Sequence, residues 1–150
     1  MLKYKFKINK SKKDSNKYKV VTEKPKYRME YPKFRFSYYL CDNKNISFKC
    51  IKDVKKFYLL FKNFKKYCCL TWEQIISNSN YHAHDVIWAL DTLPDAIKKV
   101  QNKKEIRDKP LFQFNPFTKK DPERIIGFFD YDNTFQVLGI DKKHNIYPGK

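Results

Sequence analysis

The chain has 150 residues and a formal net charge of +17, and 41% of its residues are hydrophobic and 17% aromatic. This apolar content excludes intrinsic disorder, and no apolar run approaches the ~18–20 residues that a membrane-spanning helix needs. Fixed charge of this size implies a polyanionic partner, either nucleic acid or an acidic protein, and we expect no membrane partner. Lysine greatly outnumbers arginine, so an AT-rich genome is an alternative source of part of the charge.

The N-terminus is strongly basic and patterned. Residues 1–28 hold eleven Lys and Arg but two acids. In the first eight residues apolar and basic side chains alternate, which predicts a strand with one apolar and one cationic face. A polar turn and a second short strand at 18–22 follow. Residues 1–24 are therefore predicted to form a basic hairpin.

Residues 25–51 are predicted to form a second β-hairpin. Phe34, Phe36, Tyr38 and Leu40 alternate with polar or exposed positions, as in a half-buried strand. Residues 42–45 have turn chemistry, and residues 46–51 are expected to return as the partner strand.

Residues 52–101 are predicted to be a helical segment in which residues 81–93 are ambiguous. Asp53 is placed to cap a first helix, and Thr71 with Gln74 matches a capping box for a second one. Pro94-Asp95 opens a third, short helix that ends near Gln101. On the first helix, the side chains expected to face the core are Val54, Phe57, Tyr58, Phe61, Phe64 and Cys68. The lysines expected on its opposite side are Lys52, Lys55, Lys56, Lys62 and Lys66.

Residues 109–147 return to strand patterns. Strands are predicted at 111–114, 124–130 and 134–141, the last two joined by a turn at 131–133. Strand-rich, helical and strand-rich stretches with short connections predict a single α+β domain. We expect an antiparallel sheet built from the N- and C-terminal hairpins, with two or three helices packed on one face.

Metal and cofactor chemistry is weakly supported. The cysteines Cys68 and Cys69 are adjacent, a spacing that suits neither a disulfide scaffold nor a zinc site, so a reduced, cytoplasmic protein is expected. His82 and His84 fit a solvent-facing loop better than a zinc site. Asp130 and Asp132 fit turn acids better than ligands of Mg²⁺. No metal or cofactor is therefore expected.

The basic side chains form the strongest functional signal. Lysine rows on the N-terminal strands, on the first helix and after the last strand are expected to contact phosphates, and exposed tyrosines, including Tyr27 and Tyr39, to stack on bases. The alternative is that these tyrosines are core residues and the lysines merely solvated. The candidate nucleic-acid-binding residues are Lys3, Lys5, Lys7, Lys12, Lys13, Lys17, Lys19, Lys52, Lys55, Lys62, Lys66, Lys142 and Lys143.

The C-terminal stretch ends in Asp141-Lys142-Lys143-His144, followed by Tyr147. Over residues 107–147 it resembles RelE/ParE-type toxins, and the resemblance implies a metal-independent endoribonuclease. Arg124 would then neutralise the phosphate, and His144 or Tyr147 would move protons. The alternative is that Arg124 pairs with Glu123 or Asp141, and that His144 is a turn residue.

A second resemblance concerns residues 34–40 together with 70–75, which look like small proteins of bacterial mobile elements. We therefore expect a basic protein that binds RNA, or a ribonucleoprotein complex, without catalysis. An anti-CRISPR or other anti-defence inhibitor is one such protein. A ribonuclease toxin of a toxin–antitoxin system is the alternative, and a plain RNA- or DNA-binding accessory protein also remains open.

Overall fold

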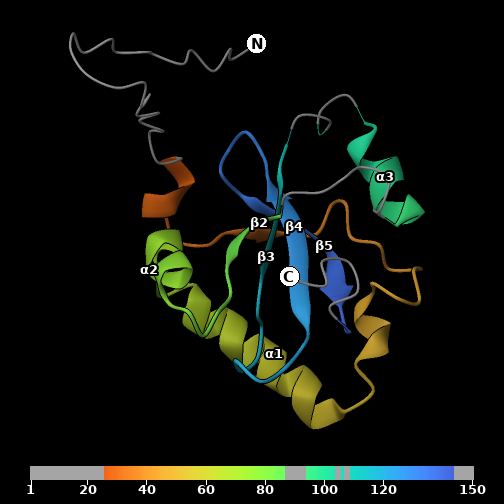
Figure 1. The fold of residues 1–150 in the computed structure, drawn as a ribbon, viewed down its shortest axis with the longest axis horizontal. Coiled ribbons are helices and arrows are strands. Elements are labelled where there is room, and N and C mark those ends of the chain that lie inside the picture. The colour runs from red at the N-terminus through yellow and green to blue at the C-terminus, as the bar shows by residue number, and fades with distance from the viewer. Residues whose placement is uncertain (1–25, 87–93, 104–105, 107–108, 144–150) are drawn as a thin grey trace, which may run out of the picture.

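The computed structural model describes residues 26–86, 94–103, 106 and 109–143. Within them, five strands form one sheet in the order β1-β5-β4-β3-β2 (Figure 1). The strands are β1 Phe34–Arg35, β2 His84–Val86, β3 Leu111–Phe114, β4 Arg124–Phe129 and β5 Phe135–Asp141. The helices are α1 Val54–Tyr67, α2 Trp72–Ser77 and α3 Asp95–Gln101. The predicted α+β class is confirmed.

The sheet is mixed rather than purely antiparallel. Strands β2, β3, β4 and β5 pair antiparallel, whereas β1 pairs parallel with β5. The predicted strands at the C-terminal end and the three predicted helices are all present. Strand β2 lies in the part of the predicted helical segment, residues 81–93, that the sequence leaves ambiguous. The basic hairpin predicted for residues 1–24 lies outside the described residues.

The hairpin predicted for residues 25–51 is wrong. Only Phe34 and Arg35 are in a strand, and a 3-10 turn, Phe48–Cys50, replaces the return strand. The alternation is misleading because the apolar side chains serve different places: Phe34 packs in one core, while Tyr38 packs in another. The chain nevertheless follows the edge of β5, since the Leu40 N–H donates to the carbonyl of Leu138.

Side chains from the two faces of the sheet form two cores. Neighbouring residues Ile125 and Ile126 point to opposite faces, and each belongs to a different cluster. Helices α1 and α2 cover the first face, and α3 covers the second through Ile97 and Val100 (Figure 1). Two helices thus pack on one face, as predicted, and α3 covers the other, because a sheet with apolar residues on both faces needs cover on both.

The core beneath α1 and α2 is aromatic. Trp72, the first residue of α2, is fully buried and packs edge-on against Phe129, with ring centroids 5.0 Å apart. The capping box predicted for α2 is present: the Thr71 hydroxyl accepts from the Gln74 N–H, and the Gln74 side chain accepts from the Thr71 N–H. The cap thus starts α2 where Trp72 enters the core.

A glycine lets the chain pass close to β5. A Cβ at Gly139 would collide with both the side chain and the carbonyl of Ile46. Ile46 is itself buried in the core beneath α3. Residue 139 must therefore lack a side chain if residues 40–46 are to lie along this edge of the sheet. None of the helices described is long and apolar enough to cross a membrane.

Candidate nucleic-acid interface

Helix α1 begins at the predicted cap. The Asp53 carboxylate accepts from the Lys55 N–H at 2.8 Å, with Asp53 in extended conformation. Lys65 and Lys66 lie in the last turn, where positive charge favours the helix dipole. The helix itself contains no acidic residue, although several of its positions are lysine. The lysines of α1 therefore have no acidic partner within the helix itself.

The face of α1 that packs on the sheet differs from the predicted one. Leu60 and Tyr67 are fully buried, and Asn63 donates from its side-chain amide to the carbonyl of Pro116 at 2.7 Å. The Tyr67 hydroxyl donates to the carbonyl of Asn115 at 2.6 Å, and burial raises the pKa of this hydroxyl, so it stays neutral. We call this side of the helix the inner face.

Most of the side chains predicted for the core lie outside it. Val54 is 81% exposed, Tyr58 71% and Phe61 55%, and Phe57 and Cys68 are also exposed. Phe64 is the exception, since it packs against the aromatic core. The helix is thus rotated relative to the prediction, by roughly one residue position of ~100°.

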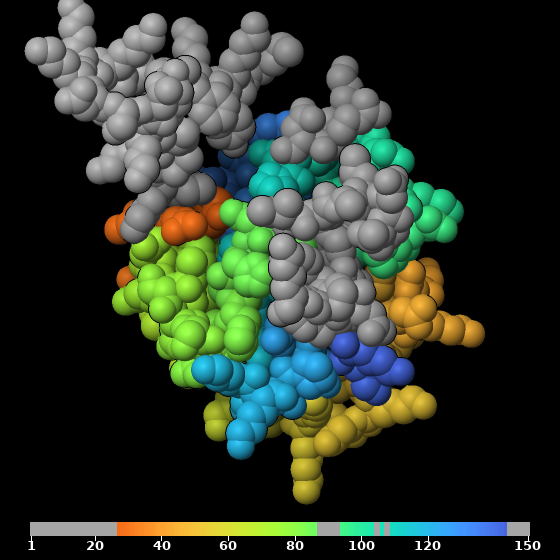
Figure 2. Space-filling model, viewed as in Figure 1, coloured from red at the N-terminus to blue at the C-terminus, as the bar shows by residue number. Residues whose placement is uncertain are grey.

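Three exposed aromatic side chains lie near each other on α1. Phe57, Tyr58 and Phe61, which we call the outer aromatic stripe, lie within one helical turn of each other. The rings of Phe57 and Phe61 are in contact, with centroids 5.2 Å apart. In Figure 2 the side chains around the start of α1, in yellow, project from the lower edge of the molecule.

Lysines flank the outer aromatic stripe. Lys55, Lys62, Lys65 and Lys66, the lysine row of α1, are all exposed. None of them forms an ion pair with any described residue, whereas lysines elsewhere pair with acids, as Lys33 does with Glu30. Lys66 lies over the Tyr81 ring at 5.6 Å, a contact that leaves its charge intact. Lys65 was not among the predicted binding residues, but it belongs to this row.

Lys56 has a different environment from its neighbour Lys55. Its ammonium lies 2.6 Å from Glu123 Oε1 and 3.1 Å from Asp121 Oδ1. Burial opposes the charge on Lys56, but the bonds to Glu123 and Asp121 outweigh it and raise the pKa of Lys56. Its charge is neutralised within the molecule, so Lys56 does not extend the lysine row.

Three other predicted cations are exposed. Lys52 is exposed just before the helix, and Lys142 and Lys143 are exposed at the end of β5. Burial raises the pKa of the Cys50 thiol, and the ammonium of Lys142 partly offsets this increase. The predicted lysines at positions 3, 5, 7, 12, 13, 17 and 19 lie outside the described residues.

Arg124, the predicted phosphate-binding residue of a ribonuclease, is buried. It is 6% exposed, and its Nη1 donates to the carbonyls of Asp121 and Glu123, both at 2.8 Å. It lies opposite Asp141 in the β4–β5 register. Burial lowers the pKa of Arg124, while Asp141 and Glu123 offset the effect. Its partners are therefore internal. His144 and Tyr147 lie outside the described residues.

The chain was compared with known proteins in three ways. Family models, curated proteins and solved structures all gave no match.

Two tyrosines expected to stack on nucleic-acid bases are used inside the protein. Tyr27 is buried and its ring is stacked on Phe129, with centroids 3.7 Å apart. The Tyr39 hydroxyl accepts from the Phe48 N–H at 2.6 Å, and burial raises its pKa. The exposed aromatic side chains of α1 are instead among those predicted for the core. The sequence does contain a signal for their exposure, because α1 has more apolar positions than one buried face can accommodate.

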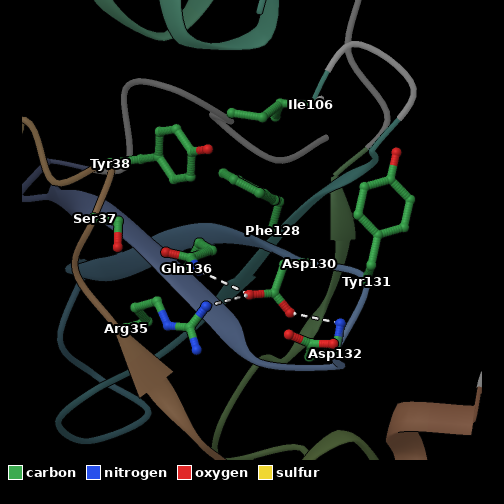
Figure 3. Close-up of a pocket in the computed structure, with 9 residues that line it drawn as sticks. All are labelled: Arg35, Ser37, Tyr38, Ile106, Phe128, Asp130, Tyr131, Asp132 and Gln136. Carbon is green, nitrogen blue, oxygen red and sulfur yellow. Dashed lines mark hydrogen bonds and ion pairs between the residues drawn. The ribbon is translucent and has the colours of Figure 1, made fainter. Parts of the chain in front are cut away.

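A hollow of about 310 Å³ opens beside β1 and the β4–β5 turn (Figure 3). At its centre the Asp130 carboxylate accepts from Arg35 Nη1 at 3.4 Å and from Gln136 Nε2 at 2.8 Å. The same carboxylate accepts from the Thr134 N–H at 2.9 Å. Arg35 and Asp130 thus form an ion pair within the chain, and this pair connects β1 to the β4–β5 turn.

The histidines and cysteines considered as zinc ligands have different environments in the structure. His84 Nε2 lies 3.0 Å from the side-chain amide of Gln113, and Cys68 and Cys69 are exposed at the end of α1. No cluster of three or more His, Cys, Asp or Glu suitable for a metal ion occurs among the residues described.

Proposed function

We propose that this protein binds nucleic acid, RNA in the first instance, alone or within a ribonucleoprotein complex, and that it acts without catalysis. The observation that carries the proposal is the lysine row of α1: four exposed ammonium groups on one helix with no ion pair among the described residues. Uncompensated cations spaced along one surface bind phosphates and release counterions. Lys52, exposed just before the helix, adds to this charge, and Lys142 and Lys143 are further exposed cations at the end of β5.

The proposal includes a cytoplasmic setting and a mobile-element origin. All four cysteines, each in a described segment, are free thiols, which suits a reducing compartment. An inhibitor that occupies an RNA-containing defence complex needs affinity and a large contact surface rather than reacting groups. An acidic protein surface is the competing partner for the same cations.

The alternative function, a metal-independent ribonuclease, depends on Arg124 reaching a phosphate. Its burial, and its two bonds to backbone carbonyls, weigh against that role. No described contact favours the ribonuclease over a binding protein. Labelled RNA incubated with the full chain in EDTA is therefore expected to stay intact.

The test is a salt series with matched lysine variants. For four to six phosphate contacts, affinity for labelled RNA should fall by about 10²–10³-fold between 50 and 200 mM salt. Replacing Lys62 and Lys66 by Gln should reduce the slope of log affinity against log salt by about two. Lys98 and Lys99 on α3 are the matched control, since their replacement removes the same charge from the opposite side of the sheet.

A salt-independent affinity would remove nucleic acid as the partner and favour an acidic protein. Equal effects of the α1 and α3 variants would show that the positive charge acts diffusely and not through α1. Cleavage in EDTA that disappears with His144→Gln would instead establish the ribonuclease.

A further inference from the structure

The outer aromatic stripe leaves large apolar surface in water. Tyr58 and Phe61 are more than half exposed, although each ring is large enough to dominate a core. The Tyr58 side chain has no hydrogen-bond or ring partner in the described part of the chain. The inner face of α1 is already filled by Leu60 and Tyr67, so packing within the described part of the chain does not account for the exposed rings.

The charges beside these rings restrict what can cover them. Lys62 lies four residues after Tyr58, and Lys65 lies four residues after Phe61, so each ring has an ammonium group one turn away. An apolar protein surface docked here would have to desolvate these lysines without a partner, which is costly. A ligand that offers flat apolar faces and negative charges in alternation matches the pattern.

We propose that the outer aromatic stripe is a base-stacking platform and that the ligand is single-stranded nucleic acid. This inference rests on the proposed function above and specifies its substrate. Unpaired bases can stack on Tyr58 and Phe61 while their phosphates reach Lys62 and Lys65. In a duplex the base faces are covered by neighbouring base pairs, so a duplex can use the lysines but not the rings.

The experiment compares a 12-nucleotide single-stranded RNA with a duplex of the same sequence, using the full chain and fluorescence anisotropy. Replacing Tyr58 or Phe61 by Ala should each weaken single-strand binding about tenfold, in the range of one lost stacking contact. Duplex affinity should change by less than about twofold. Phe61→Trp should keep the single-strand affinity, and its added fluorescence should decrease on binding the single strand.

Thermal melting of the same variants tests for an effect on folding, and little change is expected because both side chains are exposed. Strong RNA binding that is the same for both ligands, or unaffected by either Ala variant, would overturn the stacking platform and leave the proposed function standing. Binding of neither RNA would overturn both, and the stripe would then belong to a protein interface.

Discussion

The inner and outer faces of α1 divide stability from binding within one helix. On the inner face, Leu60 is fully buried and Lys56 is paired with Glu123. On the outer face lie the sequence neighbours of these two residues: Phe61, next to Leu60, and Lys55, next to Lys56. Both are exposed, and Lys55 has no ion pair among the described residues. One step along the chain thus changes the role of a side chain. The difference shows that the described residues bury the inner face of α1 and leave its outer face exposed.

The largest expected effect separates Leu60 from Phe61. Leu60→Ala leaves a cavity in the aromatic core and should lower the free energy of unfolding by about 2–5 kcal/mol. Phe61→Ala should change it by about 1 kcal/mol or less, because more than half of the Phe61 side chain is exposed. Urea denaturation of both variants measures the contrast. Similar losses in the two variants would mean that both faces of α1 are packed in solution.

The next effect separates Lys56 from Lys55. Lys56→Gln leaves the buried carboxylate of Glu123 without its cation and should destabilise the fold by about 1–3 kcal/mol. Lys55→Gln should leave stability unchanged and reduce RNA affinity instead. A destabilised Lys55→Gln variant with normal affinity would reverse the assignment of the two faces.

Lys56→Gln should also change how the stability of the fold depends on pH. Burial alone would raise the pKa of Asp121, but hydrogen bonds from Thr118 and Lys56 outweigh it, so the pKa lies below its ordinary value of 3.8. A carboxylate with a depressed pKa stabilises the fold above its unfolded-state pKa, and this stability is lost as the pH falls through the folded-state value. Acid should therefore destabilise the wild type more than Lys56→Gln, measured by urea denaturation at neutral and acidic pH.

The smallest effect concerns Asp53, which caps α1 and bonds to the backbone of Lys55 at the start of the lysine row. Asp53→Ala should cost about 1 kcal/mol through the lost cap. Asp53→Asn retains an acceptor for the Lys55 N–H and should cost less. Both variants remove a negative charge and should raise RNA affinity slightly, so for Asp53→Ala stability and affinity change in opposite directions. Unchanged affinity in both would place the RNA away from this end of the helix.

Local signals in the sequence predicted the elements better than their orientation. Asp53 and Thr71 marked the helix starts because caps depend on neighbouring backbone groups. The buried face of α1 was missed because the helix is apolar on two sides, and the choice between them depends on contacts with Asn115 and Pro116 far along the chain.

The candidate site shows the same limit. An arginine at position 124 predicts a phosphate contact, and pairing with Glu123 or Asp141 is the alternative. Burial of Arg124 opposite Asp141 follows from the register of β4 and β5. That register is a property of the assembled sheet and not of the residues next to Arg124.

The parallel pairing of β1 with β5 has a consequence for synthesis. Phe34 meets Phe135, about a hundred positions later in the chain. Strand β1 leaves the ribosome early and must wait until nearly all of the sheet has been translated before its partner exists. Contacts between such distant segments form slowly because a long loop must close first. Until β1 pairs with β5, the edge of β5 and the side chain of Phe34 are open to contacts with other chains. A chaperone would therefore be most useful at this stage.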